Sequence, residues 1–163
     1  MQIKSRNYLS KKDKKILFAQ LTELFGDNIS DALQKDLIIE EVKTDTETFI
    51  VVNKRVWVFD YEGKKIPTIY FLREHSHSLH KIVVDTGAIK FITNGADVMA
   101  PGIVYFDKTI EKGSIVAIHE EKADTLIGVG QALISGKEFS KTNKGKVIKN
   151  LHHLKDSIWE LQF

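Results

Sequence analysis

The sequence has no cysteine, only two prolines in 163 residues, and no long hydrophobic run. The lack of cysteine excludes a disulfide framework, cysteine-ligated zinc and thiol catalysis, and it fits a reducing compartment. No apolar stretch approaches the roughly 20 residues that a membrane-spanning helix needs. Residues 1–6 lead into a lysine cluster without the apolar segment of a signal peptide. We therefore expect a soluble, cytoplasmic protein with no membrane partner.

The excess of positive charge is also small. A net charge of +2 at pH 7 is too low to argue for nucleic-acid binding by itself. The distribution is more informative, because residues 137–155 contain six lysines and a single acid, Glu138. A second basic cluster, residues 11–15, contains four lysines around Asp13. Both clusters can be ordinary solvated surfaces, or they can contact several phosphates with an affinity that falls steeply as salt rises.

The N-terminal half begins with a pattern typical of an amphipathic helix. Ser10 is a candidate N-cap, the apolar positions of residues 11–25 recur at three- and four-residue spacings, and Gly26 ends the pattern. A shorter second helix is predicted over residues 29–37, with Ser30 as its cap.

After this second segment, the sequence pattern changes from one typical of helices to one typical of strands. Segments rich in β-branched and aromatic residues predict strands at 37–42, 48–52 and 56–60. Residues 66–71 are predicted to form an edge strand, because Pro67 lacks a backbone donor. The first half is therefore expected to be an α+β unit. Residues 72–80 are polar but contain no proline or glycine, so we expect a short helical connector and a domain boundary there.

The C-terminal half is predicted to be a small, nearly closed β-barrel, because short apolar segments alternate with glycine-rich turns. Gly128 and Gly130 alternate within one strand, which indicates a bend or the close approach of another backbone. A helical turn is predicted over residues 150–155, and a final strand over 158–161. The domains are expected to be 1–78 and 79–163.

Motifs for catalysis or metal binding are missing. There is no nucleophile elbow, phosphate-binding loop or dinucleotide fingerprint. His75, His77 and His80 lie close to Glu74, but no fourth strong ligand is indicated, and a polar connector explains them better than zinc. His119-Glu120-Glu121 lacks the second histidine of a zincin motif. We therefore predict no enzyme activity, no cofactor and no metal.

The most informative segment is residues 89–103. An apolar run breaks at Asn94-Gly95, crosses residues suited to one short helical turn, stops at Pro101-Gly102 and resumes at Ile103. Such a turn is expected to leave several backbone N–H groups free beside a tight pocket, where a phosphate or a nucleotide edge can bind.

Four segments in order resemble the PUA domain, an RNA-binding module named after pseudouridine synthases and archaeosine transglycosylase. They are the strand–helix–strand signature at 93–103, the strand at 112–118, the x-G-x-G strand at 127–132 and the C-terminal closure at 145–159. Ser114 stands where the family more often has an acid. Residues 5–12 and 63–68 resemble the pre-PUA domain of one protein group, which includes the malignant-T-cell-amplified translation factor and short archaeal proteins.

The resemblance implies non-catalytic RNA binding in translation, with tRNA ends, ribosomal RNA, the small ribosomal subunit or a translation-factor protein as partners. It implies an RNA groove at Gly95, Ala96, Asp97, Val98, Met99, Ala100 and Pro101. Asp97 would accept a hydrogen bond from an exocyclic amine or a 2′-hydroxyl, and Met99 would offer an apolar surface to a base. The alternative is that Asp97 caps the turn and Met99 fills the core.

The basic C-terminal segment adds candidates for contact with the RNA backbone. These are Lys144, Lys146, Lys149 and His152. Of the neighbours His152 and His153, at most one is expected to touch RNA. Two other functions remain open: a protein-interaction or ribosome-docking module that acts through the first half, and an RNA-recognition subunit of an RNA-modifying enzyme.

Overall fold

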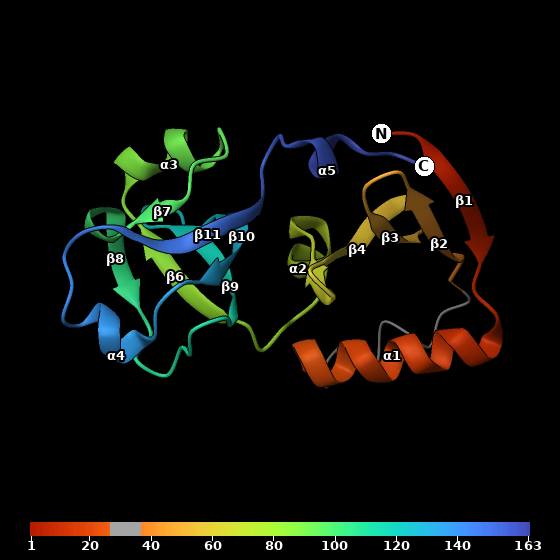
Figure 1. Ribbon diagram of the computed structural model, residues 1–163, viewed down its shortest axis with the longest axis horizontal. Helices are drawn as coiled ribbons and strands as arrows, with labels where there is room; N and C mark the ends of the chain where they lie inside the picture. The colour runs from red at the N-terminus through yellow and green to blue at the C-terminus, as the bar shows by residue number, and fades with distance from the viewer. Residues whose placement is uncertain (27–36) are drawn as a thin grey trace. The chain divides into compact units, whose positions relative to one another are not determined.

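The computed structural model describes residues 1–26 and 37–163 (Figure 1). The described chain forms two compact units, one of residues 1–78 with Leu161–Phe163 and one of Leu79–Glu160. The helix predicted at 29–37 lies outside the described residues, except for Leu37, which is not helical. That residues 1–78 and 79–163 fold as independent domains stays a prediction.

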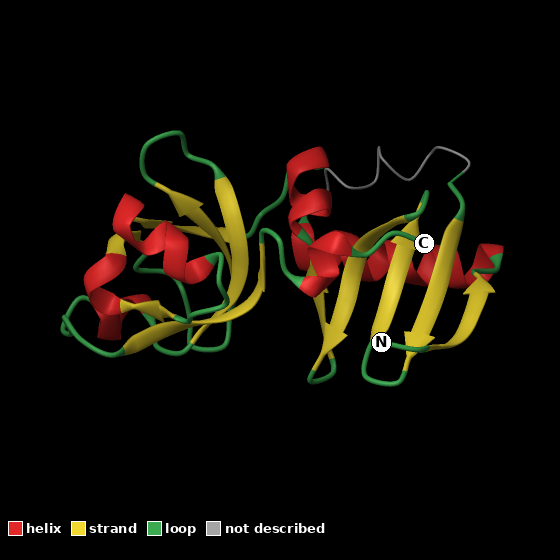
Figure 2. Ribbon diagram, turned by 90° about the horizontal axis from the view of Figure 1, so that it is seen from above, coloured by secondary structure: helices red, strands yellow, loops and turns green. Residues whose placement is uncertain are grey.

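The first unit is an antiparallel sheet of five strands in the order β1-β2-β3-β4-β5. Two helices accompany it, α1 at Lys11–Phe25 and α2 at Ile69–Glu74, and α1 runs across one face of the sheet (Figure 2). The strands are β1 at Ile3–Tyr8, β2 at Ile39–Thr44, β3 at Thr48–Val52, β4 at Arg55–Tyr61 and β5 at Lys64–Pro67. The α+β expectation is confirmed, as are three of the four strands predicted here.

Helix α1 begins and ends where the sequence predicts. The Ser10 hydroxyl accepts a hydrogen bond from the Asp13 N–H at 3.1 Å, and Gly26 at φ +102° follows the last turn. Leu17, Leu21 and Phe25 are buried, and the Phe25 ring lies 5.5 Å from the ring of Phe71 in α2. Three apolar positions on one stripe therefore attach the helix to its unit.

The edge strand predicted at 66–71 is wrong beyond Pro67. Thr68 begins α2 instead: its hydroxyl donates to the Val56 carbonyl oxygen at 2.7 Å and accepts from the Phe71 N–H at 3.3 Å. The branched and aromatic residues that follow therefore pack as a helix. The helical connector predicted at 72–80 is wrong after Glu74, because α2 ends there and residues 75–79 are neither helix nor strand.

The second unit is a sheet of six strands in the order β7-β11-β10-β9-β6-β8. All neighbouring strands are antiparallel except β6 and β9. The strands are β6 at His80–Val84, β7 at Val98–Met99, β8 at Ile103–Phe106, β9 at Ile115–Glu120, β10 at Leu126–Ala132 and β11 at Lys146–His153. The helices are α3 at Thr86–Ile92, the 3₁₀ turn η2 at Ala100–Gly102, α4 at Gly136–Phe139 and α5 at Ser157–Glu160.

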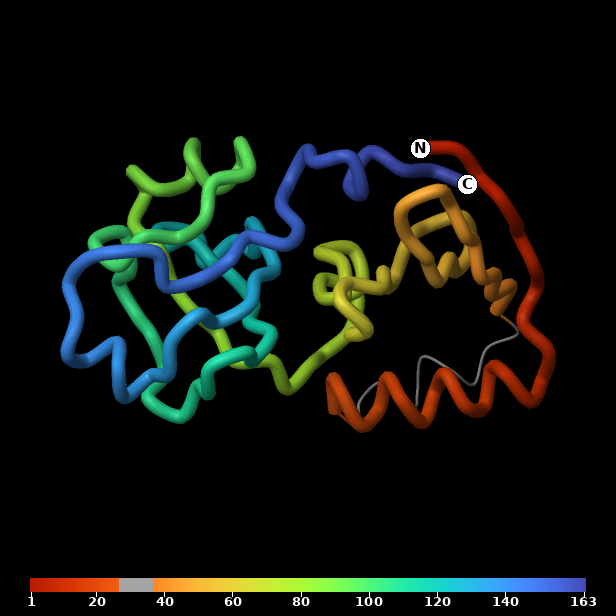
Figure 3. The backbone as a smooth tube through the Cα atoms, in the orientation of Figure 1, coloured from red at the N-terminus to blue at the C-terminus, as the bar shows by residue number. Residues whose placement is uncertain are grey.

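The outermost strands of this sheet, β7 and β8, are consecutive in the chain. Only the three residues of η2 separate them, so the sheet must curl until its two ends meet at that bend (Figure 3). The interior is filled by a buried apolar cluster that includes Ile82, Ile118 and Ile148. The predicted nearly closed barrel is therefore confirmed.

The glycines of β10 allow β11 to approach closely, as the sequence predicts. A Cβ at Gly130 would lie 2.7 Å from the Lys149 carbonyl oxygen and would collide with the Ile148 side chain. A Cβ at Gly128 would lie 3.1 Å from the His152 carbonyl oxygen. The register shifts between Val129 and Gly130, which is where the strand pair bends.

The predictions for residues 150–161 are wrong, because strand and helix are exchanged. Residues 150–153 continue β11, where Asn150 pairs with Gly130 and His152 with Val129. Residues 157–160 form the helical turn α5, and Asp156 accepts a hydrogen bond from the Trp159 N–H at 2.7 Å. Pairing with β10 therefore decides the conformation that local sequence preference misassigns.

The last three residues belong to the first unit rather than to the second. The Phe163 ring lies 6.1 Å from the ring of Phe49, and the Arg6 guanidinium carbon lies 5.9 Å from its centre. No helix within residues 1–26 and 37–163 is long and apolar enough to span a membrane.

We predict that Gly130→Ala destabilises the protein by about 2 kcal/mol, because the added methyl group must displace Ile148 or the backbone of β11. Chemical denaturation followed by circular dichroism measures the loss. Gly102→Ala is the matched control, since its Cβ would lie at an ordinary 3.4 Å from the Ala88 Cβ. Equal losses of stability in both variants would show that the close approach of β10 and β11 is not what makes Gly130 necessary.

Candidate nucleic-acid interface

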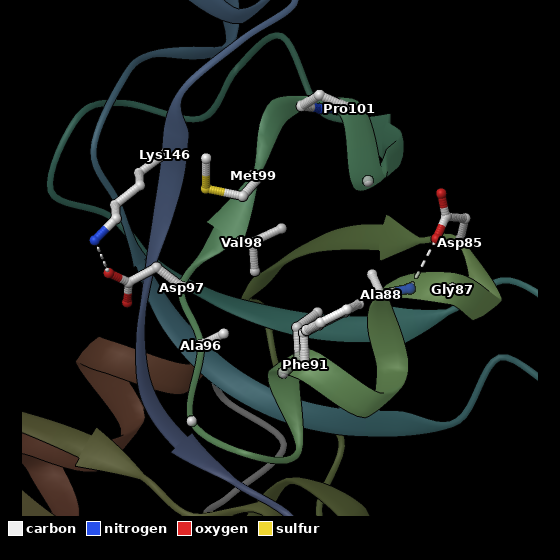
Figure 4. Close-up of a pocket in the computed structure, with 13 residues that line it drawn as sticks. Asp85, Gly87, Ala88, Phe91, Ala96, Asp97, Val98, Met99, Pro101 and Lys146 are labelled. Carbon is white, nitrogen blue, oxygen red and sulfur yellow. Dashed lines mark hydrogen bonds and ion pairs between the residues drawn. The ribbon is translucent and has the colours of Figure 1, made fainter.

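A groove of about 640 Å³ opens on the second unit beside the signature segment (Figure 4). Helix α3 forms one wall, residues 95–99 form the other, and Pro101-Gly102 closes one end. Lys146 of β11 is the lysine among its lining residues. The groove is open and mainly apolar, so it can accept a flat ligand group such as a nucleobase.

Helix α3 is held in place by its first residues. The Asp85 carboxylate accepts from the Ala88 N–H at 2.9 Å, and the Asp85 N–H donates to the Gly102 carbonyl oxygen at 2.9 Å. A Cβ at Gly102 would lie 3.4 Å from that of Ala88, so the bend at Gly102 lies close against the first turn of α3. The helix start and the η2 bend are therefore one packed structure.

The turn after α3 does not offer the free donors that the sequence predicts. The N–H groups of Asn94 and Ala96 both donate to the Phe91 carbonyl oxygen, and the Gly95 N–H donates to that of Ile92, all at 3.0–3.1 Å. Gly95 has φ +92°, which suits such a tight turn. The prediction that these amides bind phosphate is wrong, because the turn uses them itself.

Asn150 and Asp97 join this turn to β11. The Asn150 side-chain amide donates to the carbonyl oxygens of Ile92 and Ala96 at 2.9 and 3.0 Å. The Asn150 N–H donates to Asp97 Oδ1 at 2.9 Å, and Asp97 Oδ2 lies 3.3 Å from Lys146 Nζ. Asp97 therefore holds a backbone amide of β11 rather than one of its own turn, and its second oxygen faces a lysine at the groove.

The apolar surface of the groove comes from two exposed side chains. Phe91 on α3 is 66% exposed and Met99 is 46% exposed, so the alternative that Met99 fills the core is wrong. Val98 and Ala100 are buried, and of the two only Val98 lines the groove. Gly95, Ala96 and Pro101 are exposed. Six of the seven predicted residues therefore line the groove, Ala100 does not, and Phe91 extends the set.

Of the three lysines predicted to contact RNA, only one lines the groove. Lys146 is exposed and lines the groove, whereas Lys144 is exposed in the loop before β11 and does not line it. Lys149 is half-buried and stands opposite Gln131 of β10. These two lysines can reach only RNA that extends beyond the groove.

The prediction that His152 contacts RNA is wrong. Its side chain is fully buried, and Nδ1 lies 2.7 Å from Asp156 Oδ2. Strand pairing points His152 inward, and the neighbouring His153 is partly exposed. His153 Nε2 lies 3.4 Å from the Cβ position of Gly95, so this histidine, rather than His152, borders the turn.

Sequence reasoning missed α3 and with it Asp85, Ala88 and Phe91. A usable signal was present, because Asp85 is a good N-cap and residues 86–92 fit two helical turns. In a helix over these residues, Ile89 and Ile92 face the core and Phe91 faces outward.

One of the connector histidines, His75, packs against an aromatic ring. His75 packs edge-on against Trp57 with ring centres 4.8 Å apart, and its burial lowers its pKa. In the part of the chain that the structure describes, no three metal-binding side chains come together.

Comparison with known proteins agrees with this arrangement. Residues 80–154 match the PUA domain model, and residues 5–75 match a domain of unknown function, DUF1947. An uncharacterized protein of Methanocaldococcus jannaschii is 42% identical over 162 residues, which are 99% of each chain. The chain belongs to the PUA-domain family. It has the pre-PUA arrangement that the sequence predicts.

Other relatives of this PUA protein support the same grouping. Translation machinery-associated protein 20 of Saccharomyces cerevisiae is 28% identical, with 96% of this chain and 92% of that protein aligned. Human malignant T-cell-amplified sequence 2 is also among the matches. A conserved PUA domain protein from Thermoplasma acidophilum superimposes with a TM-score of 0.78 at 28% identity, covering 94% of this chain and 97% of that one.

The partly buried Asp156 predicts a dependence of stability on pH. Burial opposes its ionisation, but hydrogen bonds from His152, Trp159 and His153 outweigh burial and hold its pKa below the usual value. A lowered pKa stabilises the folded state above the unfolded pKa of about 3.9, and this stabilisation is lost as the pH falls through the folded pKa.

We therefore expect Asp156→Asn to be less stable than the parent protein by about 2 kcal/mol at pH 7. The difference should begin to shrink below the unfolded pKa of about 3.9, where the unfolded chain takes up the proton, and should be lost as the pH falls through the lower folded pKa. Urea denaturation of both proteins between pH 3 and pH 7 measures this difference in the free energy of unfolding. A difference that is constant with pH would contradict a role for the charge.

Proposed function

We propose that this protein binds RNA of the translation apparatus, tRNA or ribosomal RNA, through the groove of its PUA domain and catalyses no reaction. The observation that carries the proposal is the placement of Phe91 and Met99, two exposed apolar side chains, in one groove with Lys146. Exposed aromatic and apolar surfaces beside a cation suit an unpaired base with its phosphate.

The polar atoms of the groove favour recognition over chemistry. Its two carboxylates already accept backbone N–H groups, Asp85 from Ala88 and Asp97 from Asn150. A general acid or base needs a proton-transfer position within reach of the substrate, and one oxygen of each carboxylate is engaged in holding the walls. Asp97 Oδ2, beside Lys146, keeps the capacity to accept from a ribose 2′-hydroxyl.

The setting in translation is supported by the relatives. A protein that aligns over nearly the whole chain is named as associated with the translation machinery. We propose a cytoplasmic role beside the ribosome on that basis, with the small subunit or a translation factor as a further partner. Lys144 and Lys149 would contact the RNA backbone beyond the groove.

The first experiment is binding of the full-length protein to total cellular RNA at 50 and 300 mM salt, followed by sequencing of the RNA retained at the higher salt. Enrichment of tRNA or small-subunit rRNA is expected. Binding that vanishes uniformly with salt would leave only a basic surface and would contradict selective recognition.

Variants of the groove test the assignment of residues. Phe91→Ser and Met99→Ser should each weaken binding to the enriched RNA about tenfold, since the stacking of a base is worth about 1–3 kcal/mol. Asp97→Asn should lower the preference for RNA over DNA while keeping the bond from Asn150. Lys112→Ala is the control, because this exposed lysine does not line the groove. Equal losses of affinity for the enriched RNA and for generic RNA would contradict the assignment of these residues to a specific binding groove.

Lysine variants separate contact with the RNA backbone from recognition. Lys144→Ala with Lys149→Ala should weaken binding to all RNAs alike and reduce the salt slope by about one per lost phosphate contact. Filter binding across a series of salt concentrations measures both effects. A change of sequence preference in this variant would show that these lysines read bases.

A further inference from the structure

Two glycines at one end of the groove are not required by the fold. The chain has ten glycines; five have a positive φ, and a Cβ at three others would lie 3.1 Å or less from a backbone atom. The remaining two are Gly87 in α3 and Gly102 in η2, and both line the groove. Their lack of a side chain therefore needs a reason other than backbone conformation.

Gly87 is the second residue of α3, where glycine weakens the helix. Apart from proline, glycine is the least favourable residue in a helix, because it loses the most backbone freedom. Among the described residues, a Cβ at Gly87 would meet only Asp85 Oδ1, at 3.3 Å. That atom belongs to a side chain, so it can move by the small amount that a Cβ requires.

Three other helices of this chain show that the N-cap does not need this glycine. In α1, α2 and α4, as in α3, the side chain of the N-cap residue accepts a hydrogen bond from the N–H three residues later. The residue that corresponds to Gly87 carries a side chain in each of them: Lys12, Tyr70 and Lys137. An N-cap of this geometry therefore tolerates a Cβ, and the space at Gly87 is available to a ligand.

The two glycines lie beside the aromatic surface of the groove. Gly87 and Phe91 are one turn apart on α3, so both belong to the face that forms the groove wall (Figure 4). Gly102 is close by, because its carbonyl oxygen accepts from the Asp85 N–H and a Cβ there would lie 3.4 Å from that of Ala88. Bare backbone lets a ligand approach closely but gives a base no surface to stack on. This end of the groove therefore fits the sugar of a nucleotide whose base contacts Phe91.

The charges at this end favour a ribose over a phosphate. Asp85 lines the groove; its Oδ1 holds the start of α3, and its Oδ2 makes no hydrogen bond within the described residues. Glu121 is near, since its Oε1 accepts from the Thr86 N–H at 3.2 Å. Lys146 lies across the groove beside Asp97 (Figure 4). Two carboxylates repel a phosphate, whereas Asp85 Oδ2 can accept a hydrogen bond from a hydroxyl group.

We propose that the end of the groove between Gly87 and Gly102 is a ribose subsite. Asp85 accepts a hydrogen bond from the 2′-hydroxyl of the nucleotide whose base contacts Phe91. This inference rests on the proposed function, since it names the part of the RNA that one end of the same groove binds. The sugar is a different one from any that contacts Asp97, which lies across the groove (Figure 4).

The test uses the full-length protein labelled with ¹⁵N and two synthetic ten-nucleotide strands, oligo(rA) and oligo(dA). It therefore does not depend on which cellular RNA is bound. Chemical-shift changes at Phe91 and Met99 report binding in the groove, and their dependence on concentration gives the dissociation constant. We expect the parent protein to bind oligo(rA) about tenfold more tightly than oligo(dA), because a hydrogen bond to a carboxylate is worth an amount of that order.

Substitution of Gly87 should separate stability from binding. Alanine and leucine favour a helix more than glycine does, so Gly87→Ala and Gly87→Leu should be at least as stable as the parent in urea denaturation. Their affinity for oligo(rA) should fall, about tenfold for alanine and further for leucine, because the added side chain takes the place of the sugar. Thr86→Ala is the control: it also favours the helix, but Thr86 does not line the groove, so the affinity should not change.

Asp85→Asn tests the hydrogen-bond acceptor. Asparagine caps helices about as well as aspartate, so α3 should keep its start. Its one side-chain oxygen would be used by the Ala88 N–H, which leaves only a donor for the ligand. This variant should therefore lose most of the preference for oligo(rA) while its affinity for oligo(dA) stays the same.

Three outcomes would overturn the inference alone. A Gly87→Ala protein less stable than the parent would mean that the fold itself requires the glycine. Unchanged affinity of both Gly87 variants would mean that no ligand group lies there, and an unchanged preference in Asp85→Asn would place the ribose elsewhere. A parent protein in which neither strand perturbs Phe91 or Met99 would instead contradict the proposed groove, and the subsite would fall with it.

Discussion

The short connection between β7 and β8 is the constraint on which the second unit depends. Because only Ala100–Gly102 separates the two ends of a six-stranded sheet, the sheet has to curl, and its concave side becomes a closed apolar interior. The curl is possible only if β10 and β11 pass close to one another, and Gly128 and Gly130 remove the side chains that would prevent it. Both the core and the position of the groove follow from this geometry.

The groove is built from short polar contacts but presents apolar side chains. Asn150 and Asp97 fasten the turn to β11, and Asp85 fastens α3 to η2. These bonds consume most of the polar groups near the groove, so what remains for a ligand is Phe91, Met99 and a lysine. Under the proposed function, a surface of this composition would gain affinity from stacking, and Lys144 and Lys149 outside it would supply the salt-dependent attraction.

The sequence predicted what depends on short-range pattern. Residue type and spacing predicted the caps of α1, three strands of the first sheet and the close approach at Gly128 and Gly130, whereas the groove was predicted from the resemblance to the PUA domain. It failed where a distant partner decides the conformation. Thr68 starts a helix because it binds the carbonyl of Val56, and His152 is buried because its strand pairs with β10. Nor could composition show that the amides at 94–96 are used within the turn.

The position of the bend also separates the residues of the groove from those of the outer strand β8. Residues before and within η2, such as Met99 and Pro101, face the groove, whereas the residues after it, Val104 and Tyr105, form the outer strand. Substitutions at Val104 therefore change no residue that lines the groove, and substitutions at Phe91 or Met99 change none on β8. Because Phe91 and Met99 belong to the groove alone, a loss of RNA binding on their substitution would report on the groove and not on the packing of the strand that closes the sheet.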